Sequence, residues 1–355
     1  MSGQKILLTG VTGFMGGSFL TQLLASSNPD IKKSSFSALV RKQEQADILK
    51  AKGINAIVFN DLDDSEALKQ AASEHDIVIH SANGFHAASA KALIEGLAER
   101  KKTTGGKPVF YIQTSGTSNL ADHPITKRYI HSPPTTRVFS DATENIHQYL
   151  LDRETAEAYP QRTTDITVTT TGLALDVPTL IIMSATVYGR GTGLFNTASI
   201  QVPILTKTAI ARGQAFYVGP NGAGEWDHVH IEDLAALYEL LLGKVLAGEK
   251  VPTGEKGLYF SAAGKHSFKA VAEAVGKAGY ELGALKTAEP VSVALEEFAE
   301  VLGGNAQLAE LGFASRAVTD AALARSLGWV PKKSDADWWA SFKEEFAAVL
   351  AQTKA

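Results

Sequence analysis

A short apolar run that breaks into evenly spaced glycines stands near the start of the chain. Residues 5–17 read KILLTGVTGFMGG, with glycines at 10, 13 and 16, and a helical pattern of apolar residues begins at once. Glycine allows a tight turn and lets the backbone approach a phosphate where a side chain would collide. The start of the following helix offers unpaired N–H groups and a positive dipole end, which favour an anion. The segment therefore predicts a strand, a turn and a helix that together hold a dinucleotide.

Composition narrows the class of protein. The chain has 355 residues, of which 45% are hydrophobic, so it can bury a large core. A net charge of −4 gives no basic field for nucleic acid, and the absence of cysteine excludes disulfides and thiolate nucleophiles. There is no apolar signal segment at the start, and no later run reaches the ~18 residues of a membrane span. We expect a cytoplasmic protein that binds neither nucleic acid nor a membrane.

Over the first 115 residues, short apolar runs alternate with amphipathic stretches. After the glycine turn and its helix, strands are expected at 36–40, 56–59, 77–80 and 109–114, and helices at 43–52, 65–74 and 89–100. Strands separated by helical patterns of this length predict a parallel sheet with right-handed crossovers. The expected fold class is α/β, with a Rossmann-type doubly wound parallel sheet and a smaller C-terminal substrate lobe.

The rest of the chain is less regular. Residues 116–162 are polar, carry four prolines, and are interpreted as a long excursion over one face of the core. A further strand is expected at 179–187, and helices at 164–175, 233–242, 268–277, 293–302, 319–327 and 334–350. We expect a nucleotide-binding core over 1–193, with 116–162 as an insertion, and a mostly helical lobe over 194–355 that is interleaved with the core.

The glycine spacing resembles the TGxxGxxG turn of the short-chain dehydrogenase/reductase superfamily. The phrase TGVTGFMGG is most similar to its extended and atypical branches, and DL at 61–62, IHSAN at 79–83 and the segment PTLIIMSATVYGRGTG continue the resemblance. The resemblance covers residues 5 to about 275 and is closest to the fungal-type NAD-dependent epimerase/dehydratase group.

This resemblance implies a nicotinamide dinucleotide in the glycine turn. The second strand ends in FSALVRK, so Arg41 and Lys42 stand where an acidic residue would take the ribose 2′-hydroxyl of NAD. A basic pair at this place favours the 2′-phosphate of NADP(H). The residues implied to contact the cofactor are Gly10, Thr12, Gly13, Phe14, Met15, Gly16, Arg41, Lys42, Asp61, Leu62, Ser81, Ala82, Asn83, Ala185, Thr186 and Val187.

The residues implied to carry the chemistry depart from the family pattern. Members of the superfamily transfer the proton with a Tyr-x-x-x-Lys pair beside a serine or threonine. Thr114 and Ser115 resemble the serine position, but neither downstream tyrosine has the lysine. Tyr149 is followed by Arg153 at the lysine spacing, whereas Tyr159 is followed by Arg162 and Thr163 three and four residues later. The predicted catalytic residues are Thr114, Ser115, Tyr149 and Arg153.

The leading hypothesis is an NADP(H)-dependent oxidoreductase or isomerase acting on a small organic molecule. It would reduce a carbonyl, enone or imine, or use the cofactor in an isomerisation. Two alternatives stay open: a sugar-nucleotide epimerase or dehydratase, and a non-catalytic NmrA-like regulator that senses NADP. No metal is expected, because His228 and His230 have no third histidine nearby. Extended members often dimerise, which makes a homodimer a further hypothesis.

Overall fold

A parallel sheet forms the centre of the molecule. Across residues 3–353, the part of the chain that the computed structural model describes, its seven strands run in the order β11-β7-β5-β4-β1-β2-β3. These strands are β1 (Lys5–Thr9), β2 (Ser35–Val40), β3 (Asn55–Val58), β4 (Ile77–His80), β5 (Phe110–Gly116), β7 (Thr179–Ser184) and β11 (Leu258–Phe260). Every neighbouring pair is parallel. The expected Rossmann-type α/β fold is confirmed.

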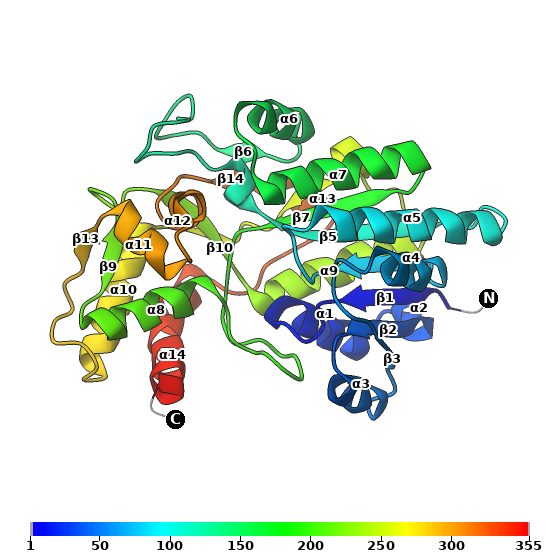
Figure 1. Cartoon of the computed structure of the whole chain (residues 1–355), viewed down its shortest axis with the longest axis horizontal. Helices are drawn as coiled ribbons and strands as arrows, with labels where there is room; N and C mark the ends of the chain where they lie inside the picture. Colours follow the sequence, from blue (N-terminus) through cyan, green and yellow to red (C-terminus); the bar gives the residue numbers. More distant parts are fainter. Residues whose placement is uncertain (1–2, 354–355) are drawn as a thin grey trace.

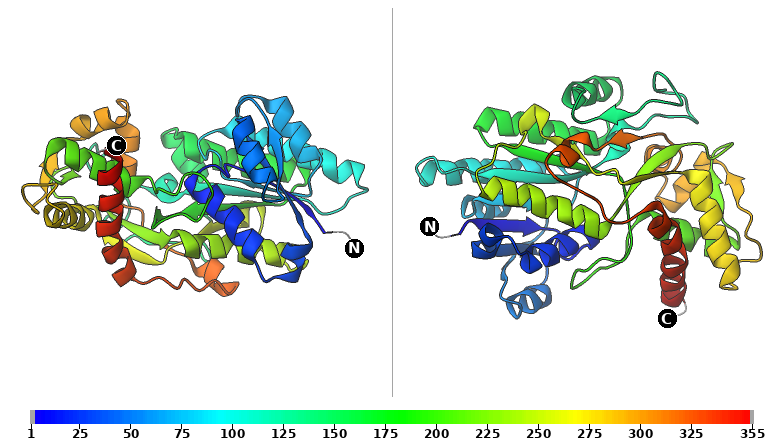
Figure 2. Two further views of the ribbon diagram at one scale, coloured as in Figure 1. Left: turned by 90° about the horizontal axis from the view of Figure 1, so that it is seen from below. Right: turned by 180° about the vertical axis from the view of Figure 1, so that it is seen from behind.

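Helices cover both faces of this sheet (Figures 1 and 2). One face carries α1, which packs against α9, and the other carries α4, α5 and α7, which lie side by side. The helices of the core are α1 (Phe14–Ala25), α2 (Pro29–Lys33), α3 (Gln43–Lys50), α4 (Ser65–Ser73), α5 (Ala87–Thr103), α7 (Pro160–Leu175) and α9 (Ile231–Leu246). Both α9 and β11 come from the second half of the chain, so the core is completed only late in the sequence.

A second lobe lies beside the carboxyl ends of the strands, at the left of Figure 1. It has its own hydrophobic cluster, to which Trp338, Phe342 and Phe346 of the last helix belong. The elements of this lobe and of its junction with the core are β8 (Thr186–Tyr188), α8 (Gln201–Arg212), β9 (Phe216–Val218), β10 (Glu225–His230), β12 (Gly264–Ser267), α10 (Phe268–Glu281), β13 (Val291–Val293), α11 (Leu295–Val301), α12 (Ala306–Phe313) and α14 (Asp335–Thr353). A capping box begins α14, because the Ser334 N–H donates to Asp337 Oδ2 at 2.8 Å and the Asp337 N–H donates to Ser334 Oγ at 3.4 Å.

The polar excursion over 116–162 contains structure of its own. It holds the short 3-10 helix η1 (Thr117–Leu120), the two-residue strand β6 (Phe139–Ser140) and α6 (Ile146–Ala156), and α7 already begins at its end. A second 3-10 helix, η2 (Gly254–Lys256), packs against α6 and α7. No helix within residues 3–353 is long and apolar enough to cross a membrane.

Two expected elements differ in the structure. The strand expected over 179–187 is two strands, since the chain leaves the core sheet at Ala185 and β8 pairs with β10 instead. The helix expected over 319–327 is a short strand, β14 (Thr319–Asp320), followed by α13 (Ala322–Ser326). Buried Asp227 holds the extended backbone there, because its Oδ2 accepts the Thr319 N–H and hydroxyl, each at 2.7 Å.

Candidate active site

The glycine turn after β1 is packed backbone against backbone. Gly10 has a φ of +74°, and a Cβ built on it would lie 2.5 Å from the Ser81 carbonyl oxygen. A Cβ on Gly16 would lie 2.4 Å from the Gly10 carbonyl oxygen. Gly13 N closes the turn by donating to the Gly10 carbonyl at 2.9 Å. Only glycine fits at positions 10 and 16, so the turn brings bare backbone to the start of α1.

The start of α1 is open to an anion. Its N-cap is Gly13, and no side chain in the described part of the chain caps it or places an acidic group in its first turn. The first N–H groups of a helix need acceptors, and its positive end favours a phosphate. Phe14 itself is buried in the core, so this residue offers the backbone rather than its ring. The turn fits the pyrophosphate of a dinucleotide.

The other predicted cofactor residues follow the carboxyl ends of neighbouring parallel strands, which share one edge of the sheet. Arg41 is exposed just after β2, while Lys42 lies 3.6 Å from Glu44 in an ion pair. Asp61 is exposed after β3 and accepts the Asp63 N–H of its own loop at 2.9 Å. The remaining predicted contacts near this edge are Thr12, Met15, Leu62, Ser81, Ala82, Asn83, Ala185, Thr186 and Val187. The topology therefore places the predicted cofactor residues after the carboxyl ends of neighbouring strands, at one edge of the sheet.

Ser81 is held in place from two sides. Its N–H donates to Thr9 Oγ1 at 3.2 Å, and its hydroxyl lies 2.8 Å from Thr114 Oγ1. Thr114 is buried and its hydroxyl also lies 2.7 Å from the Tyr238 hydroxyl of α9. The buried Thr114 hydroxyl therefore links Ser81 to Tyr238 and helps to fix the Ser81 side chain.

Ser115 points to the opposite face of the sheet. Successive strand residues alternate between faces, and Ser115 Oγ donates to Asp165 Oδ2 on α7 at 2.6 Å. Asn119 Nδ2 donates to the same carboxylate oxygen at 2.6 Å. The hydroxyls of Thr114 and Ser115, both predicted to be catalytic, therefore lie on opposite faces of the sheet.

Buried Asp165 makes stability depend on pH. Burial raises its pKa from 3.8 to about 7, against the hydrogen bonds from Ser115 and Asn119 that favour the carboxylate. Because the folded state holds this proton more tightly, Asp165 lowers stability as pH rises from about 4 to about 7. Urea denaturation measures the free energy of unfolding of Asp165→Asn and of the original protein at pH 5 and at pH 8. We expect the difference, variant minus original, to be about 2 kcal/mol more positive at pH 8 than at pH 5. Asp152→Asn, at an exposed site on α6, is the control, and a pH-independent difference for Asp165→Asn would contradict the assignment.

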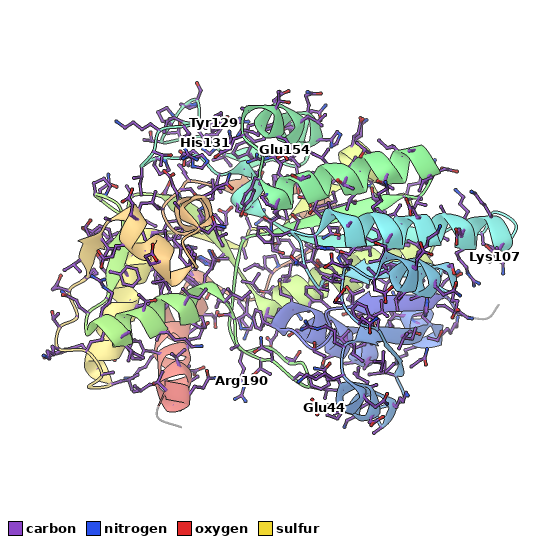
Figure 3. All side chains as sticks on the ribbon, viewed as in Figure 1. Glu44, Lys107, Tyr129, His131, Glu154 and Arg190 are labelled. Atoms are coloured by element: carbon purple, nitrogen blue, oxygen red, sulfur yellow. The ribbon has the colours of Figure 1, made fainter. Side chains whose placement is uncertain are left out.

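Tyr149 and Arg153 belong to the packing of the excursion. The Tyr149 hydroxyl donates to the Leu120 carbonyl at 3.3 Å and to the Tyr129 hydroxyl at 3.2 Å. The Arg153 guanidinium lies 3.7 Å from the centre of the Tyr129 ring. Burial, with the Tyr129 contact, raises the pKa of Tyr149 well above its ordinary value. Figure 3 shows Tyr129 at the upper edge of the molecule, far from Glu44 near the end of β2. Within the described residues, neither Tyr149 nor Arg153 forms a hydrogen bond with Thr114 or Ser115.

A second tyrosine and serine meet just beyond β5. Tyr159 is the N-cap residue of α7, and its hydroxyl donates to Ser118 Oγ at 3.2 Å. Ser118 Oγ donates in turn to Gln161 Oε1 at 2.6 Å. Ser118 lies in η1, past the last residue that pairs in the sheet, so it lies at the sheet edge. Sequence reasoning chose Thr114 and Ser115 from the run TSGTS at 114–118 and missed Ser118, the last residue of that run.

Burial favours the protonated form of the Tyr159 hydroxyl. Burial raises the pKa of Tyr159 to about 12, while the hydrogen bond with Ser118 and the charge of Arg162 act in the opposite direction. Phe85, in the loop after β4, packs edge-on against the Tyr159 ring at 5.8 Å between centroids and is 42% exposed. The arrangement is a protonated phenol beside a hydroxyl, packed within the second hydrophobic cluster and in contact with the partly exposed ring of Phe85.

His228 and His230, for which no metal is expected, lie on β10. His228 lies 3.1 Å from Asp335 and stacks on Trp338, whereas His230 lies 3.8 Å from Glu232. Among residues 3–353 no group of three or more histidine or acidic side chains is arranged to hold a metal ion.

Comparisons with known proteins agree with the Rossmann-type fold. Residues 6–253 match the model of the NAD dependent epimerase/dehydratase family. The chain is 29% identical over 341 residues to the oxidase ucsJ of an Acremonium species, covering 92% of this chain and 93% of that protein. It is 26% identical over 266 residues to an uncharacterized protein of Saccharomyces cerevisiae, covering 72% of this chain and 76% of that protein.

Solved structures share the fold over nearly the whole chain. The dTDP-glucose 4,6-dehydratase DesIV of Streptomyces venezuelae, with NAD and TYD bound, superposes with a TM-score of 0.67, at 16% identity and with 97% of both chains covered. The UDP-glucose 4-epimerase of Thermotoga maritima, with UDP-glucose, gives 0.62 at 16% identity, covering 98% of this chain and 99% of that chain. Identity this low shows the fold alone.

Proposed function

Because the chain belongs to the NAD-dependent epimerase/dehydratase family, we propose that it is an NADP(H)-dependent reductase of a small organic molecule bearing a carbonyl, enone or imine. One observation carries the proposal: the hydrogen bond of 3.2 Å between Tyr159 and Ser118. Tyr159 packs against Phe85 of the loop after β4, and Ser81 at the start of that loop lies against Gly10 of the glycine turn. A proton donor and a polarising hydroxyl at such a place suit the reduction of a C=O or C=N group.

The cofactor would be held by the chain's own backbone and one arginine. The first turn of α1 offers N–H groups to the pyrophosphate, and exposed Arg41 offers its guanidinium to a 2′-phosphate. When bound, the reduced nicotinamide supplies the hydride. The family is dependent on nicotinamide dinucleotides, and the preference for NADP(H) is part of our proposal.

Tyr159 would act as the acid. A phenol with a pKa of about 12 stays protonated at neutral pH, so it can give a proton to the oxygen or nitrogen that gains the hydride. Ser118 can then turn its O–H from Gln161 toward the phenolate and stabilise it until water restores the proton. Because Tyr159 is only 2% exposed, Phe85 would have to move aside to admit the substrate.

The same pKa disfavours an epimerase. An epimerase or an alcohol dehydrogenase needs its tyrosine as a base, whereas the raised pKa of Tyr159 favours the protonated phenol at neutral pH. The relative named an oxidase supports redox chemistry, and oxidation by this chain would require alkaline pH. A non-catalytic NADP sensor would have no use for the Tyr159 and Ser118 pair.

A panel of small carbonyl, enone and imine compounds tests the proposal. We expect NADPH consumption with at least one compound and loss of that activity in Ser118→Ala, with NADPH affinity unchanged. If the protein binds NADPH but converts none of the panel, the sensor hypothesis replaces this one.

Arg41→Ala tests the choice of cofactor. A charge-assisted contact with the 2′-phosphate is worth about 1.5–3 kcal/mol, so we expect NADPH affinity to fall about 10- to 100-fold, with NADH affinity changed less than about twofold. Fluorescence titration measures both affinities. The control is Lys107→Ala, which removes an exposed cation at the far right of Figure 3. Equal weakening of NADPH and NADH would rule out the 2′-phosphate contact.

A further inference from the structure

Arg162 is a fully buried cation next to Tyr159 and Ser118. It is 0% exposed, and its guanidinium carbon lies 5.6 Å from the centre of the Tyr159 ring. We propose that Arg162 is the positioning residue that fixes Ser118 against Tyr159, in place of the lysine that this chain lacks. The inference rests on the proposed function for its catalytic meaning, but its contacts can be tested without any substrate.

The first set of contacts holds the serine side of the pair. Arg162 Nε donates to the carbonyl of Asn119 at 3.1 Å, and Asn119 directly follows Ser118 in η1. Arg162 Nη1 donates to the Glu157 carbonyl at 2.7 Å, near the end of α6. One rigid guanidinium thus ties η1 to the segment that leads into Tyr159.

The second set holds the tyrosine side. Arg162 Nη1 lies 3.4 Å from Glu154 Oε2, and the same oxygen accepts the Tyr159 backbone N–H at 3.1 Å. Thr163, which occupies the position of the family's lysine, donates its hydroxyl to the other oxygen of Glu154. Glu154, labelled in Figure 3, therefore links Arg162, Thr163 and Tyr159. The residue in the lysine position holds the carboxylate that anchors the tyrosine.

The charge itself also matters. A buried guanidinium near the Tyr159 ring favours the phenolate, an effect that a lysine would otherwise supply. Arg162 Nη2 is buried and finds no hydrogen-bond partner within residues 3–353.

The test compares Arg162→Met, which keeps the volume and loses the charge, with Arg162→Lys, which keeps the charge and loses the forked contacts. In Arg162→Met we expect kcat to fall about 100-fold, with KM for substrate and NADPH changed less than about threefold, because misplacing a reacting group by about 1 Å has this effect. We expect hydrogen exchange to speed up in peptides covering 117–121 and 157–161. Arg162→Lys should recover part of kcat.

Arg316→Met is the matched control, because Arg316 is also buried and bonded to a backbone carbonyl but lies at the junction with the second lobe. It should lower thermal stability without changing hydrogen exchange in those two segments. The proposal is overturned if hydrogen exchange at 117–121 and 157–161 is the same in Arg162→Met as in the original protein. It is also overturned if the kcat of Arg162→Met stays within threefold of the original value. If the original protein reduces no compound of the panel, the proposed function fails, while the exchange data still decide whether Arg162 holds the pair.

Discussion

Tyr159→Phe is expected to lower kcat about a thousandfold while leaving NADPH affinity unchanged. The substitution removes only the hydroxyl that donates to Ser118, and the ring keeps its place against Phe85. General acid catalysis by a positioned side chain contributes typically about 10²–10⁴-fold, so loss of the acid should fall in this range. Steady-state kinetics on the best compound of the panel, with NADPH binding followed by fluorescence, measure the two effects separately.

Tyr149→Phe supplies the decisive comparison. Its hydroxyl contacts the Leu120 carbonyl and Tyr129, so its removal should cost at most about 1 kcal/mol of stability and leave kcat nearly unchanged. The sequence prediction, with Tyr149 as the donor, requires the reverse result. A large loss in Tyr149→Phe together with normal kinetics in Tyr159→Phe would return the catalytic role to Tyr149.

Gly16→Ala is expected to weaken NADPH binding by at least about 100-fold. The added Cβ would lie 2.4 Å from the Gly10 carbonyl oxygen, and backbone rather than a flexible side chain would have to yield. A shift of about 1 Å in this turn would misalign the N–H groups at the start of α1, and several charge-assisted hydrogen bonds would weaken together. Isothermal titration with NADPH measures the loss, and far-ultraviolet circular dichroism shows whether the fold persists.

Gly312→Ala is the control, because it makes the same substitution at a site with room for a Cβ. Gly312 lies within a helix, its φ is not positive, and a Cβ there would meet no atom within 4 Å. Alanine also favours a helix over glycine by about 1 kcal/mol, so stability should rise slightly and NADPH affinity should stay the same. Normal NADPH binding by Gly16→Ala would show that the ligand does not rely on the close-packed turn.

The fold could be predicted because its signals are local. The glycine turn, the apolar strands and the amphipathic helices of the first 115 residues each occupy a short window, and β4 falls at the expected 77–80. The exceptions depend on distant groups. The extended backbone at Thr319 is held by Asp227, a partner that is remote in sequence and unrelated to any local propensity.

The proton donor could not be predicted in the same way. Tyr149 lies closer in sequence to Ser115 and has an arginine at the lysine spacing, so counting residues favoured it. The three-dimensional arrangement distinguishes Tyr149 from Tyr159, because α7 begins at Pro160 and makes Tyr159 its N-cap residue. Strand alternation also directs Thr114 and Ser115 to opposite faces of the sheet, which residue spacing alone did not reveal. The cofactor residues and the catalytic roles remain predictions that the variants above address.

The late completion of the core sheet has a consequence for how this protein can be made and altered. Strand β11 covers the free edge of β7, and α9 packs along α1, yet both follow residue 230 in the chain. A fragment ending at residue 193 would leave an unpaired strand edge and an apolar helix face in water, which are hazards for aggregation. During synthesis α1 is made early, but its packing partner α9 follows only after residue 230. Grafting this cofactor site onto another protein would therefore require the whole chain through β11.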